Sequence, residues 1–192
     1  LNGRLNLALF LFTGLLLLCL FDFYALPHND WANFSGPARA FARAELPGEL
    51  KVAPVYPLLI ALASGMSASE AALLRGAQAI SLLSGLVLLA ALWALGRRYL
   101  PAWHPILLLL VAFNPCFLEL SLQPLVETLL VALLGLAFLG LAQNRPGSAC
   151  LAASAATLAR MDAGPLLPLA MGARLLAPGS WTRRLVPSLL AG

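Results

Sequence analysis

The sequence predicts an all-α protein, a polytopic transmembrane helical bundle, and three observations predict it. Hydrophobic residues make up 61% of the 192 residues and charged residues only 10%, whereas soluble domains carry about 25% charged residues. The mean hydropathy is +0.88. Apolar runs alternate with short polar intervals along the chain. Because one crossing needs roughly 20 apolar residues, the chain is long enough for about six crossings and leaves no room for a separate soluble domain.

The charge distribution predicts the orientation of the helices. The net charge of +4 does not indicate nucleic-acid binding, because the arginines lie at the ends of apolar runs, as at the cytoplasmic ends of membrane helices. These residues are Arg97, Arg98, Arg145, Arg183 and Arg184. We therefore expect a cytoplasmic N-terminus. The three cysteines, Cys19, Cys116 and Cys150, are widely spaced in apolar runs and are interpreted as small buried hydrophobes.

The first two predicted elements are a membrane span and an interfacial helix. Residues 5–24 form an apolar run that leads to the outer face. Asn29 or Asp30 then caps a helix that ends at Pro47 and Gly48. The apolar residues of this helix recur at helical spacing: Trp31, Phe34, Ala38 and Phe41. Such a helix is expected to lie in the membrane interface.

The next predicted elements return the chain to the cytoplasm. Pro54 and Pro57 bracket the start of a short apolar helix. Ser67 or Ser69 restarts the chain, and residues 70–96 form a long helix that ends inside the cell at two arginines.

The second half of the chain predicts two more crossings and a hairpin. Residues 104–118 cross outward, and Asn114 and Pro115 break or kink this helix near its outer end. Residues 122–142 cross back after a short outer turn around Glu119 and Ser121. The apolar segments 149–159 and 163–177 are short for crossings and predict a hairpin whose polar tip is Arg160 to Asp162.

Charged residues at membrane depth are the candidates for function, because each costs about 2.5 to 3.5 kcal/mol there. They also have structural explanations. Asp30 can be a helix cap, Glu127 can be hydrated near the interface, and Arg160 can pair with Asp162. Lys51 can be a headgroup lysine. The residue pattern alone leaves both interpretations open.

Four patches follow one another in the chain: Asp30 with Phe34, Ala38 and Arg39; KVAPVYPLL at 51–59; NPCFLELSLQPLVETLLVALLGL at 114–136, with Glu127; and LAASAATLARMDAGPLLPLAM at 151–171, with Arg160 and Asp162. In this order they resemble the GT-C superfamily of polytopic membrane glycosyltransferases, which includes protein mannosyltransferases and aminoarabinose transferases. Four positions depart from the pattern of the family: Trp31, Phe34, Ala53 and Met161.

The resemblance implies an inverting glycosyltransferase that takes a sugar from a polyprenyl-phosphate donor at the non-cytoplasmic face. Its fold would be GT-C-like, with interfacial helices in a first outer loop of about residues 25–68. Asp30 would be the general base. The other implied site residues are Lys51, Tyr56, Arg39 and Arg160 at the donor phosphate, with Glu127 and Asp162 as supporting polar groups.

The resemblance also has implications for the cofactor, the partners and the location of the protein. A divalent cation, Mg²⁺ or Mn²⁺, stays an open question, because Trp31 replaces the second acidic residue of a two-carboxylate site. The expected partners are the lipid-linked donor, membrane lipids and an acceptor glycan, lipid or protein, with no nucleic acid. We expect a bacterial inner (plasma) membrane location, and we interpret residues 1–192 as the N-terminal part of one longer transmembrane module.

Two other function classes stay open. A transporter or flippase for a lipid-linked or anionic substrate would also place charges among broken helices, but it predicts an internal repeat of the spans, which the sequence does not show. A non-catalytic assembly subunit predicts that Asp30 and Lys51 can be replaced without effect.

Overall fold

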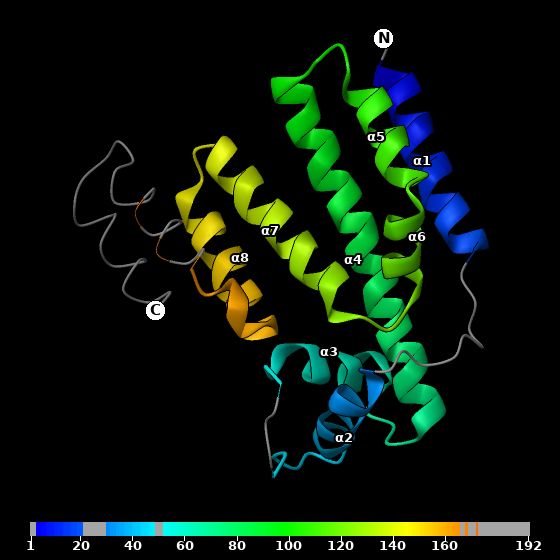
Figure 1. The fold of residues 1–192 in the computed structure, drawn as a ribbon, viewed down its shortest axis with the longest axis vertical. Coiled ribbons are helices and arrows are strands. Elements are labelled where there is room, and N and C mark those ends of the chain that lie inside the picture. Colours follow the sequence, from blue (N-terminus) through cyan, green and yellow to red (C-terminus); the bar gives the residue numbers. More distant parts are fainter. Residues whose placement is uncertain (1–2, 21–29, 49–51, 166–167, 169–171, 173–192) are drawn as a thin grey trace.

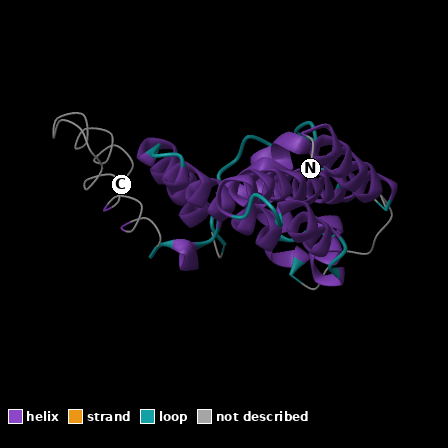
Figure 2. Cartoon of the chain, turned by 90° about the horizontal axis from the view of Figure 1, so that it is seen from above, coloured by secondary structure: helices purple, strands orange, loops and turns teal. Residues whose placement is uncertain are grey.

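The structure, a computed structural model, describes residues 3–20, 30–48, 52–165, 168 and 172. Within these ranges all regular elements are helical, with no strand (Figure 2). The predicted all-α class is therefore confirmed. The helices are α1 (Gly3–Cys19), α2 (Trp31–Ala42), α3 (Val55–Ala63), α4 (Glu70–Tyr99), α5 (His104–Ala112), α6 (Pro115–Leu122), α7 (Val126–Ala142) and α8 (Pro146–Ala159), followed by the short 3₁₀ helix η1 (Met161–Ala163).

The long helix α4 organises the packing (Figure 1). Along most of its length it packs against α1, α5, α6 and α7, through a core centred on Leu82, Leu89, Leu108, Phe117 and Ala132. Near its N-terminus, α4 packs instead against α2 and α3, which lie together at that end of the bundle. A second core, which includes Trp31, Phe34, Tyr56, Ile60, Leu73 and Val126, joins these helices to the start of α7.

The first elements follow the predicted pattern with shifted ends. The buried residues of α2 are Trp31, Phe34 and Ala38, three of the four residues predicted to share its apolar face. This helix ends at Ala42 rather than at Pro47, because Ala44 adopts a positive φ of 58° and the Glu45 N–H donates to the Ala40 carbonyl. Ser69 is the residue that caps α4, its Oγ accepting from the Ala72 N–H at 3.3 Å, so that prediction is confirmed.

The predicted span 104–118 is broken into two helices at Asn114, one of the two outcomes predicted there. The Asn114 side chain accepts hydrogen bonds from the Cys116 and Phe117 N–H groups and starts α6, and α5 and α6 meet at 61°. The outer turn predicted around Glu119 and Ser121 was wrong, because both residues lie inside α6. The chain turns instead at Gln123 to Leu125, where Pro124 cannot continue the helix.

The predicted burial of the cysteines is confirmed for one residue. Cys150 is buried, whereas Cys19 and Cys116 are exposed on their helices. All three are free thiols, as their spacing predicted.

One described helix, Glu70–Tyr99, is long and apolar enough to cross a membrane, and α5 with α6 would make a second if the bent pair is a single span. The helices α1 and α7 have 17 residues each, about 25 Å at 1.5 Å per residue, which is somewhat less than a hydrocarbon core of about 30 Å. Much of the predicted hairpin partner, residues 163–177, lies outside the described residues. Polytopic membrane insertion therefore stays a prediction.

Gly76 allows α3 to lie directly on α4, and replacing it should destabilise the fold. A Cβ at Gly76 would lie 2.9 Å from the Ile60 carbonyl oxygen and 3.0 Å from the Ser64 nitrogen, both backbone atoms. We expect Gly76→Ala to lower the free energy of unfolding by about 1 to 3 kcal/mol, because the helices must separate. Thermal unfolding of the purified protein measures this.

Gly14→Ala is the matched control, since Gly14 also lies within a helix that packs on α4. Its added Cβ would meet only Leu86 Cδ2, at an ordinary contact distance of 3.6 Å. We expect this substitution to stabilise the protein by about 0.5 to 1 kcal/mol, because alanine loses less backbone entropy than glycine on helix formation. Destabilisation of similar size in both variants would contradict the close α3–α4 contact.

Candidate functional site

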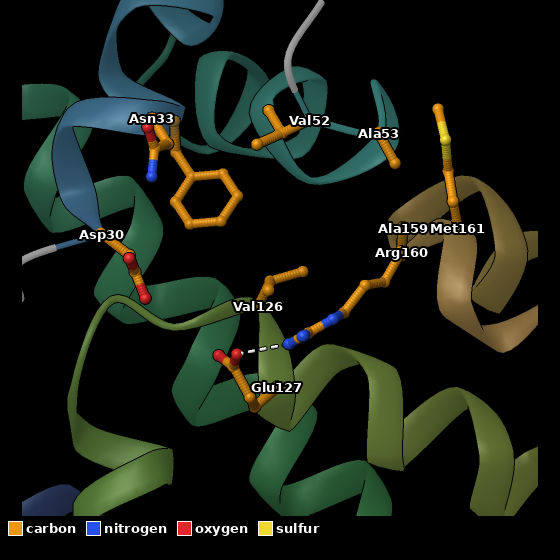
Figure 3. Close-up of a pocket in the computed structure, with 10 residues that line it drawn as sticks. Asp30, Asn33, Val52, Ala53, Val126, Glu127, Ala159, Arg160 and Met161 are labelled. Atoms are coloured by element: carbon orange, nitrogen blue, oxygen red, sulfur yellow. Dashed lines mark hydrogen bonds and ion pairs between the residues drawn. The ribbon is translucent and has the colours of Figure 1, made fainter.

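The candidate site is an open cavity of about 340 Å³ between the paired helices α2 and α3 and the adjacent ends of α7 and α8 (Figure 3). Four segments form its wall: the start of α2, the residues before α3, the start of α7 and the end of α8. The lining residues are Asp30, Asn33, Phe34, Val52, Ala53, Val126, Glu127, Ala159, Arg160 and Met161. Three residues that the sequence singled out for their charge, Asp30, Glu127 and Arg160, therefore lie around one cavity.

Arg160 and Glu127 form the ionic contact of the cavity. Arg160 Nη1 lies 2.6 Å from Glu127 Oε1, and the two side chains are 41% and 34% exposed. Figure 3 shows the arginine reaching from α8 to the start of α7. Glu127 Oε2 is buried and has no hydrogen-bond partner among the described residues. The pair joins two charges that would each be costly to leave alone at partial burial.

This contact answers two questions that the sequence left open. Glu127 is paired with an arginine rather than only hydrated, and Arg160 has a carboxylate partner on α7. Arg160 also makes a further contact. Asp162 belongs to η1, but its side chain lies outside the described residues, so the predicted role of Asp162 stays a prediction.

Asp30 occupies the N-cap position of α2 without capping it through its side chain. Its carboxylate makes no hydrogen bond to the first turn of the helix, and the residue is exposed. The structural explanation of Asp30 as a side-chain cap is therefore not supported. In Figure 3 Asp30 lies on the α2 side of the cavity, with Asn33 one turn further along the helix. Asn33 is a lining residue that sequence reasoning missed, although a spacing of three places it on the same helix face as Asp30.

The start of α7 is held by a hydroxyl from α4, which helps to position Glu127. Ser81 Oγ donates to the Leu125 carbonyl at 3.1 Å and accepts from the Leu125 N–H at 3.2 Å. The Thr128 hydroxyl donates to the Leu120 carbonyl across the same turn. These bonds satisfy backbone groups that the break between α6 and α7 would otherwise leave unpaired in a buried region.

Tyr56 supports the cavity wall from behind. Its side chain is fully buried, and its ring meets the Phe34 ring edge-on at 5.0 Å. Burial raises the pKa of Tyr56 above its ordinary value, the charge of Glu127 adds to this, and the Ser81 hydroxyl opposes it. The phenol therefore stays neutral. Tyr56 lies in the core behind Phe34, not among the lining residues named above.

Arg39 is engaged on the far side of α2 from the cavity. It forms an ion pair with Glu70 at the start of α4, and its Nε donates to the Ala68 carbonyl at 3.3 Å. The Trp31 indole N–H donates to the other oxygen of the same carboxylate. Glu70 thus fixes α2 against α4, a role that its sequence position at a helix start did not reveal.

Two predictions about ligands are left open by the described residues. Lys51 lies outside them, although its neighbours Val52 and Ala53 line the cavity. The described ranges contain no group of three or more His, Cys, Asp or Glu side chains placed to hold a metal ion.

Chemically, the cavity combines an exposed carboxylate with a guanidinium that could bind an anionic oxygen. Comparisons with protein-family models, with curated proteins and with solved structures each return no match for this chain. The arguments for function therefore come from the residues and from the geometry of this cavity.

Proposed function

We propose that the protein is an inverting glycosyltransferase of the polytopic membrane type, which moves a sugar from a polyprenyl-phosphate donor to an acceptor at the non-cytoplasmic face. One observation carries the proposal. The cavity gathers Asp30, Glu127 and Arg160 from three separate segments of the chain, and these residues belong to three of the four patches that resemble the GT-C superfamily.

The proposed reaction is a single displacement. The acceptor hydroxyl or amine attacks the anomeric carbon, its bond to the sugar forms as the carbon–oxygen bond to phosphate breaks, and the electron pair leaves with the polyprenyl phosphate. Asp30 accepts the acceptor proton as general base. Its exposed carboxylate at the cavity wall supports this role.

Among the described residues that line the cavity, Arg160 is the one with a positive charge. We propose that it contacts the leaving phosphate. A guanidinium binds phosphate oxygens through several N–H groups and stabilises the charge that develops on them. Before the donor binds, Glu127 holds the guanidinium in place at 2.6 Å. Lys51 is a further candidate for contact with the donor phosphate, as the resemblance implies. The resemblance leaves open whether a divalent cation takes part.

We also propose how the protein lies in the membrane. The helices α2 and α3 lie together at one end of α4 (Figure 1), and we place them at the outer interface, with the N-terminus in the cytoplasm. The cavity then lies near the outer headgroups, where a lipid-linked sugar can reach it from the bilayer. We propose the bacterial inner (plasma) membrane as the location, as the resemblance implies.

One observation favours a transporter as the second candidate. The 61° break between α5 and α6 is the kind of interrupted helix that surrounds a transported substrate. The break does not contribute to the cavity wall, however, because the lining residues come from other segments. The glycosyltransferase is therefore the better supported proposal.

A transfer assay tests the proposal directly. Membranes containing the full-length protein are incubated with a panel of radiolabelled polyprenyl-phosphate sugars and, in parallel, with the matching nucleotide sugars. We expect label to reach a glycan, lipid or protein acceptor only from the lipid-linked donors, and the new linkage to have the inverted anomeric configuration.

The same membranes distinguish the alternatives. Movement of the labelled lipid between leaflets without transfer would support a flippase, and retained configuration in the product would contradict the single displacement. Neither transfer nor movement with any donor of the panel would favour the assembly subunit.

A further inference from the structure

A second cavity, of about 410 Å³, lies between α7 and α8 towards the loop that joins them. It is therefore at the opposite end of this helix pair from Asp30 and Arg160. Most of its wall is apolar and is formed by Leu133, Leu136 and Leu139 of α7 with Leu151, Ala152 and Ala155 of α8. Since α8 contributes mainly alanines where α7 contributes leucines, the helices leave a groove rather than a filled contact.

The polar end of this groove collects groups that favour an anion. Gln143, Arg145 and Ser148 line it there. Arg145 is exposed, and no ion pair or side-chain hydrogen bond of its guanidinium is found within the described residues. It is also the N-cap residue of the 14-residue helix α8, so the unpaired N–H groups of the first turn lie beside it.

Close contact between the helices fixes this polar end. A Cβ at Gly140 would lie 2.9 Å from the Ala149 nitrogen and 2.9 Å from Ser148 Oγ. The Ser148 hydroxyl donates to the Arg145 carbonyl at 2.8 Å. Arg145 and Ser148 therefore lie where α7 and α8 pack closely together.

The length of the groove matches one leaflet of a bilayer. From Leu133 to Gln143 the helix rises by about 15 Å at 1.5 Å per residue. Half of a hydrocarbon core of about 30 Å is the same length. If α7 lies across the membrane, Arg145 is at headgroup depth and the apolar part of the groove runs towards the bilayer centre.

We propose that the groove between α7 and α8 binds one anionic phospholipid, with its phosphate at the Arg145 guanidinium and the N–H groups of the first turn of α8 and one acyl chain between the leucines of α7 and the alanines of α8. An acyl chain fits the apolar wall, and a negative headgroup complements the arginine. Basic sites between membrane helices on the cytoplasmic side bind anionic lipids in this way. The inference rests on the membrane placement of the proposed function, not on sugar transfer.

Native mass spectrometry of the full-length protein in detergent tests this site. The protein is given equal amounts of dioleoylphosphatidylglycerol and dioleoylphosphatidylcholine, which share their acyl chains and differ in headgroup charge. We expect one retained phosphatidylglycerol, preferred by about fivefold, the effect of one arginine near an anionic headgroup. Arg145→Gln should remove the preference and Arg145→Lys should keep it.

Two further variants test whether lipid retention depends on this groove or on surface charge in general. Arg98→Gln removes an arginine from the end of α4, away from the groove lining, and should leave the preference unchanged. Ala155→Trp fills the apolar part and should lower the retention of both lipids. An unchanged preference in Arg145→Gln, or an equal loss in Arg98→Gln, would overturn the proposal.

The source of the phosphate and the link to transfer are tested in the same preparation. Inorganic phosphate in large excess should not displace the lipid, and displacement would show a simple anion site instead. Because the readout involves no sugar, failure of lipid binding and failure of transfer are separate results. We expect Arg145→Gln to transfer sugar at the wild-type rate.

Discussion

The Asp30→Asn protein is expected to transfer sugar about 10² to 10⁴ times more slowly than the wild type, the usual contribution of a general base. Asparagine has nearly the same size and shape as aspartate, but its amide cannot accept the proton of the acceptor. The initial rate of label transfer, measured at equal protein levels, gives this ratio.

The same substitution should leave the fold unchanged. Asp30 is exposed and makes a contact elsewhere in the structure, but its side chain makes no hydrogen bond to the first turn of α2, and asparagine is as good an N-cap residue as aspartate. We therefore expect the free energy of unfolding to change by no more than about 0.5 kcal/mol, as for most surface substitutions. A large loss of rate with an unchanged unfolding temperature would separate chemistry from stability.

Glu45→Gln is the matched control for Asp30→Asn. Glu45 is an exposed carboxylate in the same polar part of the chain, lies just after α2, and is not a lining residue of the cavity. It should transfer sugar at the wild-type rate. Equal losses in both variants would indicate a general effect of negative charge, and a normal rate in Asp30→Asn would remove the base from this position.

Local patterns in the sequence predicted most of the helices, because their causes are local. The apolar spacing gave the buried face of α2, and Ser69 at the start of α4 was one of two predicted caps. The break between α5 and α6 could not be settled in the same way. Whether Asn114 kinks one helix or starts another depends on its hydrogen bonds to Cys116 and Phe117, and both outcomes fit the same sequence.

The partners of the charged residues were harder to predict than the helices. Arg160 has an acidic neighbour two positions away in the sequence, but its contact with Glu127 on α7 spans 33 positions. Arg39 pairs with Glu70 on α4. Both contacts depend on how α2, α4, α7 and α8 pack, which no spacing within one helix determines. The resemblance to a family named several of these residues but did not pair them.

Removing Arg160 is expected to have a larger effect on transfer than removing its partner Glu127. Without Arg160 the leaving phosphate loses a charged donor, and loss of one such donor costs about 10² to 10³ in rate. Glu127→Gln removes the charge that holds the guanidinium but leaves the guanidinium itself, so the rate should fall by less than about tenfold. The two variants are Arg160→Gln and Glu127→Gln, compared by kcat for a saturating lipid-linked donor.

Both substitutions should also lower the free energy of unfolding, because each breaks the same contact, and Arg160→Gln should lower it somewhat more because Arg160 makes a further contact. Both side chains are partly exposed, at 41% and 34%, so solvent screens the pair and each loss should be about 1 to 2 kcal/mol. The double variant should lose less than the sum of the two single variants, since the contact can be broken only once. Thermal unfolding of the four proteins gives this coupling free energy.

The ion pair between Arg39 and Glu70 provides the comparison that separates positioning from chemistry. It also joins two helices at partial exposure, but neither of its residues lines the cavity. Arg39→Gln and Glu70→Gln should lower stability like the Glu127 and Arg160 variants and should have equal, small effects on kcat. If Arg160→Gln and Glu127→Gln also have equal, small effects on kcat, the Arg160 guanidinium only connects α8 to α7. If Arg160 contacts the leaving phosphate, kcat must differ between Arg160→Gln and Glu127→Gln but not between Arg39→Gln and Glu70→Gln.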